Sequence, residues 1–283
     1  MACEYKASVI ISIYSNVEAL RVVLDSLNRQ TERNFEIIIS EDADFPHVRE
    51  FCAQYPFTND YQLLTQPDLG WRKNRALNNA IRAARSEWLI FIDGDCILHP
   101  RFVEFHLRLS GPRHIVAGKR VKLNAELSSL LLQDVDNWPV VEKRLRACFF
   151  TGRKQGNGFI EEAFFIDPSS WLGWIPRCRT MYQLKGCNMS FSKTAITAIN
   201  GFDEEYIRPA IGEDIDLTWR FERAGYKLVS ARNLAVQYHL HHKENWTEQE
   251  ENIRMMKKKM EQDEYICRKG LVDKGVNTYL CSD

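Results

Sequence analysis

The stretch WLIFIDGD, residues 88–95, decides the fold of this chain. Five apolar residues have the right length for a buried strand, and they are followed by two carboxylates, Asp93 and Asp95, separated by Gly94. Carboxylates this close repel each other unless a cation lies between them. Hard divalent cations prefer such oxygen ligands, and a glycine lets the backbone approach a ligand closely. The stretch therefore predicts a metal ion, with a bound phosphate, at the carboxyl edge of a sheet.

The composition narrows the class of protein. The chain has 283 residues, enough for one large domain or two small ones, with 45% hydrophobic and 27% charged residues. Lysine plus arginine and aspartate plus glutamate both total 38, so the formal net charge is zero and no nucleic-acid partner is expected. The sequence shows neither a secretory signal pattern nor an apolar run approaching 18 residues. The eight cysteines are scattered without a Cys-x-x-Cys pair, which favours reduced thiols and a cytoplasmic location.

Strands and helices alternate in the first half. Apolar runs at 7–14, 35–39, 61–65 and 88–92 predict strands, and helical spacing predicts helices at 17–27, 47–55 and 72–84. This order is typical of an α/β fold with a Rossmann-like, mostly parallel sheet, in which ligands bind beyond the carboxyl ends of the strands. Polar residues follow three of these strands, at 14–16, 41–42 and 93–95, so we expect them to converge on one crevice. Asn16 also suits the N-cap of the helix that follows it.

The second half is less regular. We expect a strand at 115–123, a helical segment at 126–148 interrupted at 138–139, and a mobile, glycine-bearing loop at 151–159. Further predictions are a helix from Gly212 to about Ala224, capped by Gly225, a final strand at 227–237, and a charged helical segment at 247–268.

Two clusters in this half have both a structural and a catalytic interpretation. Glu213, Asp214 and Asp216 lie at a predicted helix start, where acidic residues stabilise the helix dipole, but three of them exceed what a cap needs and one could act as a general base. His239, His241 and His242 suit either a metal site or a solvated cluster. A site of carboxylates, one histidine and phosphate oxygens would suit Mn²⁺ or Mg²⁺. The basic stretch at 70–75 could approach a diphosphate or form a plain basic surface.

Taken together, these segments resemble the GT-A glycosyltransferases of family 2, over roughly residues 6–245. The first strand, the pair Glu41-Asp42 and the Asp-x-Asp motif at 93–95 match the donor side of that family. Three segments, 186–191, 200–204 and 212–217, look like the acceptor side shared with galactosyltransferase and chondroitin-polymerase-type enzymes.

The resemblance implies a GT-A domain at 1–245, with a nucleotide-sugar-binding half at 1–110 and an acceptor-binding half at 111–245, followed by a C-terminal helical extension at 246–283. It implies an inverting, metal-dependent enzyme that moves a hexose or N-acetylhexosamine from a UDP-sugar to a hydroxyl of a saccharide or lipid-linked saccharide. The context would be bacterial surface polysaccharide synthesis, with peripheral contact at the inner face of the membrane. The cofactor would be Mn²⁺ or Mg²⁺.

The resemblance also implies roles for single residues. Asp214 would be the catalytic base, and Asp95 and His239 would bind the metal, with His241 as the second choice. Ser12 and Tyr14 would contact the nucleobase. The substrate-binding residues it implies are Ser12, Tyr14, Asn16, Glu41, Lys73, Asn74, Asn78, Asp93, Gly94, Asn188 and Glu213.

Two departures from the family pattern and two rival functions remain open. Glu41 replaces the usual first aspartate, and residues 209–212 lack the aromatic Gly-Trp-Gly segment of related galactosyltransferases. Trp171 or Trp174 could supply that aromatic surface, although core packing is favoured for both. The rival functions are a nucleotidyltransferase and a non-catalytic nucleotide-sugar binding module. The segment 247–268 suits packing on the domain better than a membrane-surface helix.

Overall fold

A seven-stranded sheet forms the centre of the molecule in a computed structural model that describes residues 4–151, 155–209, 211–243 and 248–274. The strand order is β3-β2-β1-β4-β8-β6-β9. Neighbouring strands are parallel except at β8, which is antiparallel to both β4 and β6. The mostly parallel α/β fold predicted from the sequence is therefore confirmed. The strands are β1 (Ala7–Ile13), β2 (Phe35–Glu41), β3 (Tyr61–Leu64), β4 (Trp88–Asp93), β6 (His114–Ala117), β8 (Asn188–Ser192) and β9 (Lys227–Ser230).

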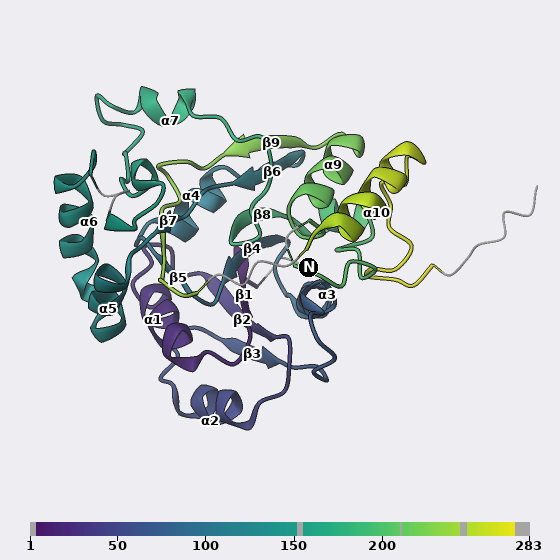
Figure 1. Cartoon of the computed structure of the whole chain (residues 1–283), viewed down its shortest axis with the longest axis horizontal. Coiled ribbons are helices and arrows are strands. Elements are labelled where there is room, and N and C mark those ends of the chain that lie inside the picture. Colours follow the sequence, from purple (N-terminus) through teal and green to yellow (C-terminus); the bar gives the residue numbers. More distant parts are fainter. Residues whose placement is uncertain (1–3, 152–154, 210, 244–247, 275–283) are drawn as a thin grey trace, which may run out of the picture.

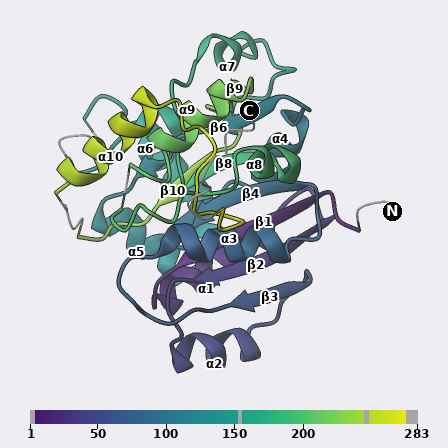
Figure 2. The ribbon, with the colours of Figure 1, turned by 90° about the vertical axis from the view of Figure 1, so that its right-hand side faces the viewer.

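Helices cover both faces of this sheet (Figures 1 and 2). Val9 and Ile11 of β1 pack into a core with α1, α2 and α4, while Ile10 packs into a second core with α3, α8 and α9. Because both faces are buried, the central strands are apolar at nearly every position, which is why they read as continuous runs. The helices are α1 (Val17–Leu27), α2 (Pro46–Gln54), α3 (Lys73–Ala83), α4 (Phe102–Arg108), α8 (Lys193–Ala198) and α9 (Ile215–Arg223).

The described part of the chain also forms a second, three-stranded sheet. It is formed by β5 (Cys96–Leu98), β10 (Gln237–His239) and β7 (Val121–Lys122), with β10 in the middle. It shares a core with α5 (Ala125–Gln133) and α6 (Trp138–Ala147), which lie at the opposite end of the molecule from α10 (Glu250–Glu261) (Figure 1). Neither β5 nor α4 was predicted, since both are short and follow the Asp-x-Asp motif without a break.

Two of the strands predicted from the sequence are each divided in the structure into a pair of strands, and the members of each pair belong to different sheets. The strand expected at 115–123 is β6 and β7, and the one expected at 227–237 is β9 and β10. Each pair is separated by a position with a special backbone requirement. A Cβ on Gly118 would lie 2.4 Å from the Asn188 side chain, and Asn233 has φ of +60°. At these two points the chain passes from the main sheet to the three-stranded sheet. There β7 and β10, from the second half of the sequence, join β5 from the first half.

The helical segment expected at 126–148 is interrupted earlier than predicted. A short 3₁₀ turn at Val135–Asn137 separates α5 from α6, and Trp138 and Pro139 begin α6 rather than break it. Proline is tolerated in a first helical turn because its missing N–H has no partner there. In the loop expected at 151–159, residues 152–154 lie outside the described part. Its end is anchored, because the backbone of Gly158 exchanges hydrogen bonds with Lys122 at 2.8 and 2.9 Å.

The C-terminal segment packs on the main body. The helix expected at 247–268 is the shorter α10, whose Asn252 and Lys259 are buried against the domain. Their spacing of seven residues places both on one helix face, so packing on the domain is confirmed for this helix. In the described part of the chain, no helix has the length and apolar character needed to cross a membrane. A short helix, α7 (Trp174–Cys178), precedes β8.

Candidate active site

The carboxyl ends of β1, β2 and β4 meet at one edge of the main sheet. The register pairs Ile13 with Glu41 and Ser12 with Asp93, so the three polar strand ends converge as the sequence predicts. The N–H of Gly94 donates to the carbonyl of Ser12 at 2.8 Å. A Cβ on Gly94 would lie 2.4 Å from Cγ2 of Ile13 and 3.1 Å from the Ser12 carbonyl oxygen. Packing against β1 therefore accounts for this glycine without any ligand.

Asp95 lies against two histidines from the far end of the chain. Because β10 runs antiparallel to β5, His239 pairs with Cys96, the residue after Asp95. Asp95 Oδ2 is 3.3 Å from Nε2 of His239 and 3.1 Å from Nε2 of His242, and the two ring nitrogens are 3.2 Å apart. Burial alone would raise the pKa of Asp95, but hydrogen bonds from both histidines lower it well below its ordinary value. Asp95 therefore remains an anion with two imidazoles turned toward it.

These three groups fit a divalent metal ion. Ligand atoms about 2.1 Å from one ion and at right angles to each other lie about 3 Å apart. The three separations of 3.1–3.3 Å therefore suit one face of an octahedral ion. Two imidazoles with one carboxylate suit Mn²⁺ better than Mg²⁺, which prefers oxygen ligands. His241 is not in this group: its side chain is exposed, and its backbone N–H donates to Ser128.

Asp93 faces two cations. Its Oδ1 is 2.9 Å from Nζ of Lys73, and its Oδ2 is 3.3 Å from Nη1 of Arg120. Lys73 also lies 2.6 Å from Glu213, so one ammonium joins the strand-end carboxylate to the start of α9. Burial would lower the pKa of Lys73, but Asp93 and Glu213 together raise it well above its ordinary value. Lys73 is therefore charged, and it connects the two halves of the site.

Asp214, the N-cap of α9, lies in a different environment. Its Oδ1 accepts a hydrogen bond from the N–H of Gly186, and its Oδ2 is 3.7 Å from Nζ of Lys185. Burial and the neighbouring Glu213 raise its pKa to about 7, against the lowering effects of Lys185, Gly186 and Lys73. Its side chain still has 21% of its surface exposed. A partly exposed carboxyl that titrates near neutrality can accept a proton from a substrate.

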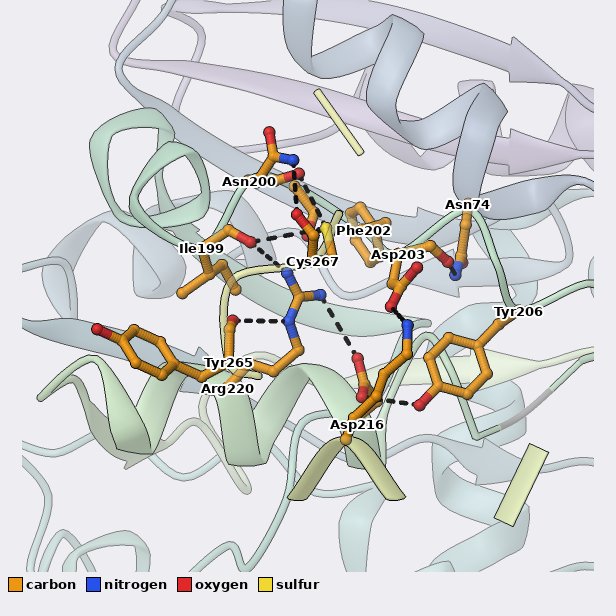
Figure 3. A network of polar contacts seen from close by, with 12 residues as sticks. Asn74, Ile199, Asn200, Phe202, Asp203, Tyr206, Asp216, Arg220, Tyr265 and Cys267 are labelled. Atoms are coloured by element: carbon orange, nitrogen blue, oxygen red, sulfur yellow. Dashed lines mark hydrogen bonds and ion pairs between the residues drawn. The ribbon is translucent and has the colours of Figure 1, made fainter. Parts of the chain in front are cut away.

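The third acidic residue of this segment, Asp216, is structural. It is fully buried, accepts from the Tyr206 hydroxyl at 2.9 Å and pairs with Arg220 at 3.4 Å (Figure 3). Arg220 in turn donates to the carbonyls of Ile199 and Tyr265, which ties the C-terminal segment to α9. The polar cluster at 213–216 thus combines a candidate base with a buried anchor.

Glu41 and Tyr14 lie beside the strand ends. Glu41 is 1% exposed, its Oε1 accepts only a long 3.4 Å bond from the Phe45 N–H, and its Oε2 has no hydrogen-bond partner among the described residues. Burial raises the pKa of Glu41. A buried carboxyl with an unused acceptor suits a ligand N–H. Tyr14 is largely exposed, packs its ring edge against Phe45, and donates to Asp68 at 2.9 Å.

Four asparagines expected to bind substrate are occupied by the protein itself. Asn16 caps α1 by accepting from the Ala19 N–H at 3.0 Å, although its side chain remains exposed. Asn78 is fully buried and bonds to Phe202 and Glu204, and Asn74 donates to the Asp203 carbonyl at 2.8 Å. Asn188 is fully buried and donates to the carbonyls of Lys119 and Ala235. The last three therefore position segments around the site, and the completely buried Asn78 and Asn188 offer substrate no surface.

Sequence reasoning missed three residues of the site and misjudged two tryptophans. His242 follows the short strand β10, Arg120 precedes the short strand β7, and Lys185 precedes Gly186. Of these three, only His242 is indicated by the sequence, as part of the histidine cluster. The core interpretation of Trp171 and Trp174 is wrong, because they are 84% and 60% exposed. Both lie in the irregular segment before β8, where aromatic content does not indicate burial.

Comparisons with known proteins agree with this geometry. The family described as "Glycosyl transferase family 2" matches residues 8–155, more than half of the chain, and the family described as "N-terminal domain of galactosyltransferase" matches residues 176–243. These matches cover the strand-end carboxylates and the α9 segment respectively. They favour a glycosyltransferase over a nucleotidyltransferase or a non-catalytic binding module.

Similar proteins include polysaccharide-forming enzymes. Chondroitin synthase from Escherichia coli is 23% identical over 244 residues, covering 82% of this chain and 34% of that protein, so the chain spans about a third of its length. TarS from S. aureus in complex with UDP-GlcNAc has a TM-score of 0.56 at 13% identity, covering 89% of this chain and 65% of that one. The mannosyltransferase PcManGT from Pyrobaculum calidifontis, in complex with GDP-Man and Mn²⁺, has a TM-score of 0.54 at 16% identity, covering 90% and 61%.

Proposed function

This chain belongs to glycosyltransferase family 2, and we propose that it transfers a hexose or N-acetylhexosamine from a UDP-sugar to a hydroxyl of a saccharide acceptor, with inversion at the anomeric carbon. The observation that carries the proposal is the contrast between Asp95, an anion beside two histidines, and Asp214, a carboxyl with a pKa of about 7. Lys73 lies between the two sides, bonded to Asp93 and to Glu213. One side suits a nucleoside diphosphate, and the other suits an acceptor hydroxyl.

On the donor side, Asp95, His239 and His242 would hold the divalent cation, for which we favour Mn²⁺. When bound, that ion would act as a Lewis acid toward the departing diphosphate. Lys73 and Arg120 lie on either side of Asp93 and would add positive charge near the same phosphates. Glu41 would accept from the imide N–H of uracil, since its buried Oε2 is unused, and the exposed ring of Tyr14 would pack against the base.

On the acceptor side, Asp214 would remove the proton from the attacking hydroxyl. Its pKa of about 7 leaves a substantial ionised fraction at neutral pH while keeping it basic enough to accept a proton. Gly186 and Lys185 orient and partly neutralise its two oxygens, and Glu213 would bind a sugar hydroxyl. Direct attack of the hydroxyl requires no protein nucleophile, so a single displacement with inversion follows.

The substrate context comes from the relatives. The similarity to a chondroitin synthase and the match to a galactosyltransferase family support a growing polysaccharide as acceptor, in bacterial surface polysaccharide synthesis. The domain division at 245 and 246 stays part of this proposal. Residues 1–110 would supply most donor contacts, and 111–245 would supply the acceptor contacts together with His239, His242 and Arg120 on the donor side. The C-terminal extension would follow at 246–283, with its helix α10 against the domain.

The experiment that tests this proposal measures UDP release from a panel of UDP-sugars, with Mn²⁺ or Mg²⁺ and with oligosaccharide acceptors. We expect release that needs the metal, is faster with Mn²⁺, and increases with a suitable acceptor. Release of pyrophosphate instead would contradict the proposal, as would binding of UDP-sugars without any turnover.

The stereochemistry needs a separate measurement. NMR assignment of the new glycosidic bond should show the anomeric configuration opposite to that of the donor. Retention of the donor configuration would contradict single displacement by Asp214.

A further inference from the structure

A cavity with a volume of about 560 Å³ lies along α3. We call it the α3 pocket. It is bounded by α3, the segment 204–207 and the segment 269–273. Figure 2 shows the yellow C-terminal segment passing beside α3, where Arg82 holds it by donating to the carbonyls of Gly270 and Leu271 at 2.9 and 2.7 Å. None of the residues that line the pocket belongs to the Asp95 cluster.

A basic stripe along α3 forms one wall of the pocket. Arg72, Arg75, Asn79 and Arg82 follow each other at intervals of three, four and three residues, which places them on one helix face. Lys269 lies across from this stripe. Four cations therefore meet two carboxylates, Glu204 and Asp273, and 4 − 2 leaves two positive charges in excess. In a chain with a formal net charge of zero, this excess is local.

The cations of the α3 pocket are not used in ion pairs. Within residues 4–151, 155–209, 211–243 and 248–274, no carboxylate pairs with Arg72, Arg75, Arg82 or Lys269, whereas Arg101 pairs with both Glu104 and Asp167. The guanidinium of Arg72 donates to the neighbouring Trp71 carbonyl and its backbone N–H donates to Asp42, each at 2.8 Å, while Arg75 and Lys269 are exposed. Unpaired guanidinium and ammonium groups gathered in one cavity suit a carboxylate or a phosphate.

The size and the walls of the pocket suit a sugar that carries such a group. Its volume lies in the range of small-molecule sites and far exceeds that of a phosphate ion. The half-exposed Ile207 supplies apolar surface and the partly exposed Asn79 supplies an amide, while Tyr206 and Asn74 are buried behind them. Oδ1 of Asn74 has no hydrogen-bond partner in the described part of the chain. Apolar surface, an amide and cations together match a charged saccharide better than a bare anion.

The pocket is joined to the candidate base through Tyr206, which is labelled in Figure 3 beside Asp216. A Cβ on Gly212 would lie 2.4 Å from the Tyr206 ring, and the Tyr206 hydroxyl bonds to Asp216. Glu213 and Asp214 lie between these two contacts in the sequence. On its other side, the pocket uses the same first turn of α3 that carries Lys73. The pocket and the candidate base are therefore connected through Tyr206 and through the first turn of α3.

We propose that the α3 pocket binds a carboxylate or phosphate group carried by the acceptor saccharide, so that the acceptor is an acidic glycan. This inference rests on the proposed function, because it assigns the occupant to the acceptor. Arg75 and Lys269 would contact the anion, Arg72 and Arg82 would frame it, and the exposed side chain of Ile207 would pack against the sugar ring.

The test is an NMR titration of the full chain with four probes: methyl glucuronoside, methyl glucoside 6-phosphate, methyl glucoside and inorganic phosphate. We expect at least one sugar acid to bind more tightly than the neutral glucoside and more tightly than inorganic phosphate. The preferred sugar acid then identifies the group as a carboxylate or a phosphate. Equal binding of inorganic phosphate would mean an adventitious ion only and would overturn the proposal, as would equal binding of the neutral glucoside.

A double variant locates the binding. Arg75→Ala/Lys269→Ala should weaken binding of the preferred acid probe by about a hundredfold, since it removes two charged hydrogen bonds and each is worth about tenfold or somewhat more. The matched control is Arg177→Ala/Arg254→Ala, which removes two exposed arginines that have no ion pair in the described residues, and it should bind like the unmodified chain. Unchanged binding in the first variant would overturn the proposal.

Donor hydrolysis separates this inference from the proposed function. If the unmodified chain releases no UDP from any UDP-sugar, the proposed function fails whatever the probes show. If UDP is released but the first double variant binds acid probes unchanged, only the pocket assignment fails. We expect both double variants to keep the rate of UDP release that is measured without acceptor.

Discussion

Asp95 and Asp214 are two carboxylates of one site, and their surroundings shift their pKa values in opposite directions. Asp95 accepts from His239 and His242, and these bonds lower its pKa against the raising effect of partial burial. Partial burial and the neighbouring Glu213 raise the pKa of Asp214 to about 7. The difference indicates a division of roles: a carboxylate that stays ionised suits a metal, and one that titrates near neutrality suits proton transfer. Variants that change one of these two carboxylates, or its immediate partners, test this division.

The largest expected effect is on turnover. Asp214→Asn keeps the shape of the side chain but cannot accept a proton, so kcat should fall by about a thousandfold, within the range of general-base catalysis. Steady-state assays of sugar transfer measure this. The affinity for UDP should stay near that of the unmodified chain. A variant that retained most of its turnover would remove Asp214 as the base.

The next effect is on the metal. Asp95→Ala removes the one anion of its cluster, and Mn²⁺ affinity should fall by about a hundredfold or more. Titration calorimetry with Mn²⁺ in the presence of UDP measures this. An unchanged Mn²⁺ affinity would mean that the ion binds elsewhere.

A smaller effect distinguishes two neighbouring histidines. His242→Ala removes one of two imidazoles near Asp95 and should weaken Mn²⁺ binding by about tenfold. His241→Ala is the matched control, since that side chain lies outside the cluster, and it should leave Mn²⁺ binding unchanged. The opposite order of effects would show that the chain near residue 242 adopts another arrangement when the metal is bound.

The smallest effect is on the pH profile. Only the ionised form of Asp214 accepts a proton, so kcat/KM should rise with pH through about 7 and then level off. Between pH 7 and pH 6 the decrease should be about fivefold, because a single group with a pKa of about 7 is half ionised at pH 7 and about one-tenth ionised at pH 6. In Asp214→Asn, the residual kcat/KM should lose this step. A step that persists in the variant would belong to another group.

The two sides also differ in how far the sequence predicts them. The donor side lies at the ends of strands that read as apolar runs, so Ser12, Glu41 and Asp93 could be placed together from topology alone. Asp95 could be placed at a metal site from the same strand end, but the choice of His239 required the resemblance. His239 meets Asp95 across β5 and β10, strands of three residues each that no periodicity reveals. Arg120 enters through β7, which has only two residues.

The polar residues that sequence reasoning assigned to substrate were the least reliable. Asn78 and Asn188 suit either ligand binding or internal hydrogen bonding, and the choice depends on burial created by distant segments, 202–204 for Asn78 and 235 for Asn188. Asp216 also has two possible uses, since the sequence shows its partner Arg220 only at the i, i+4 spacing and does not show that the pair is buried. Local patterns identify such residues as special but do not decide between the two uses.

The measurement that tests the central claim most directly is calorimetric titration of UDP, with Mn²⁺ present, into Asp95→Ala and Asp214→Asn side by side. The proposed division of roles predicts that Asp95→Ala loses metal-dependent UDP binding while Asp214→Asn binds UDP like the unmodified chain. Loss of UDP binding in Asp214→Asn together with full retention in Asp95→Ala would contradict it.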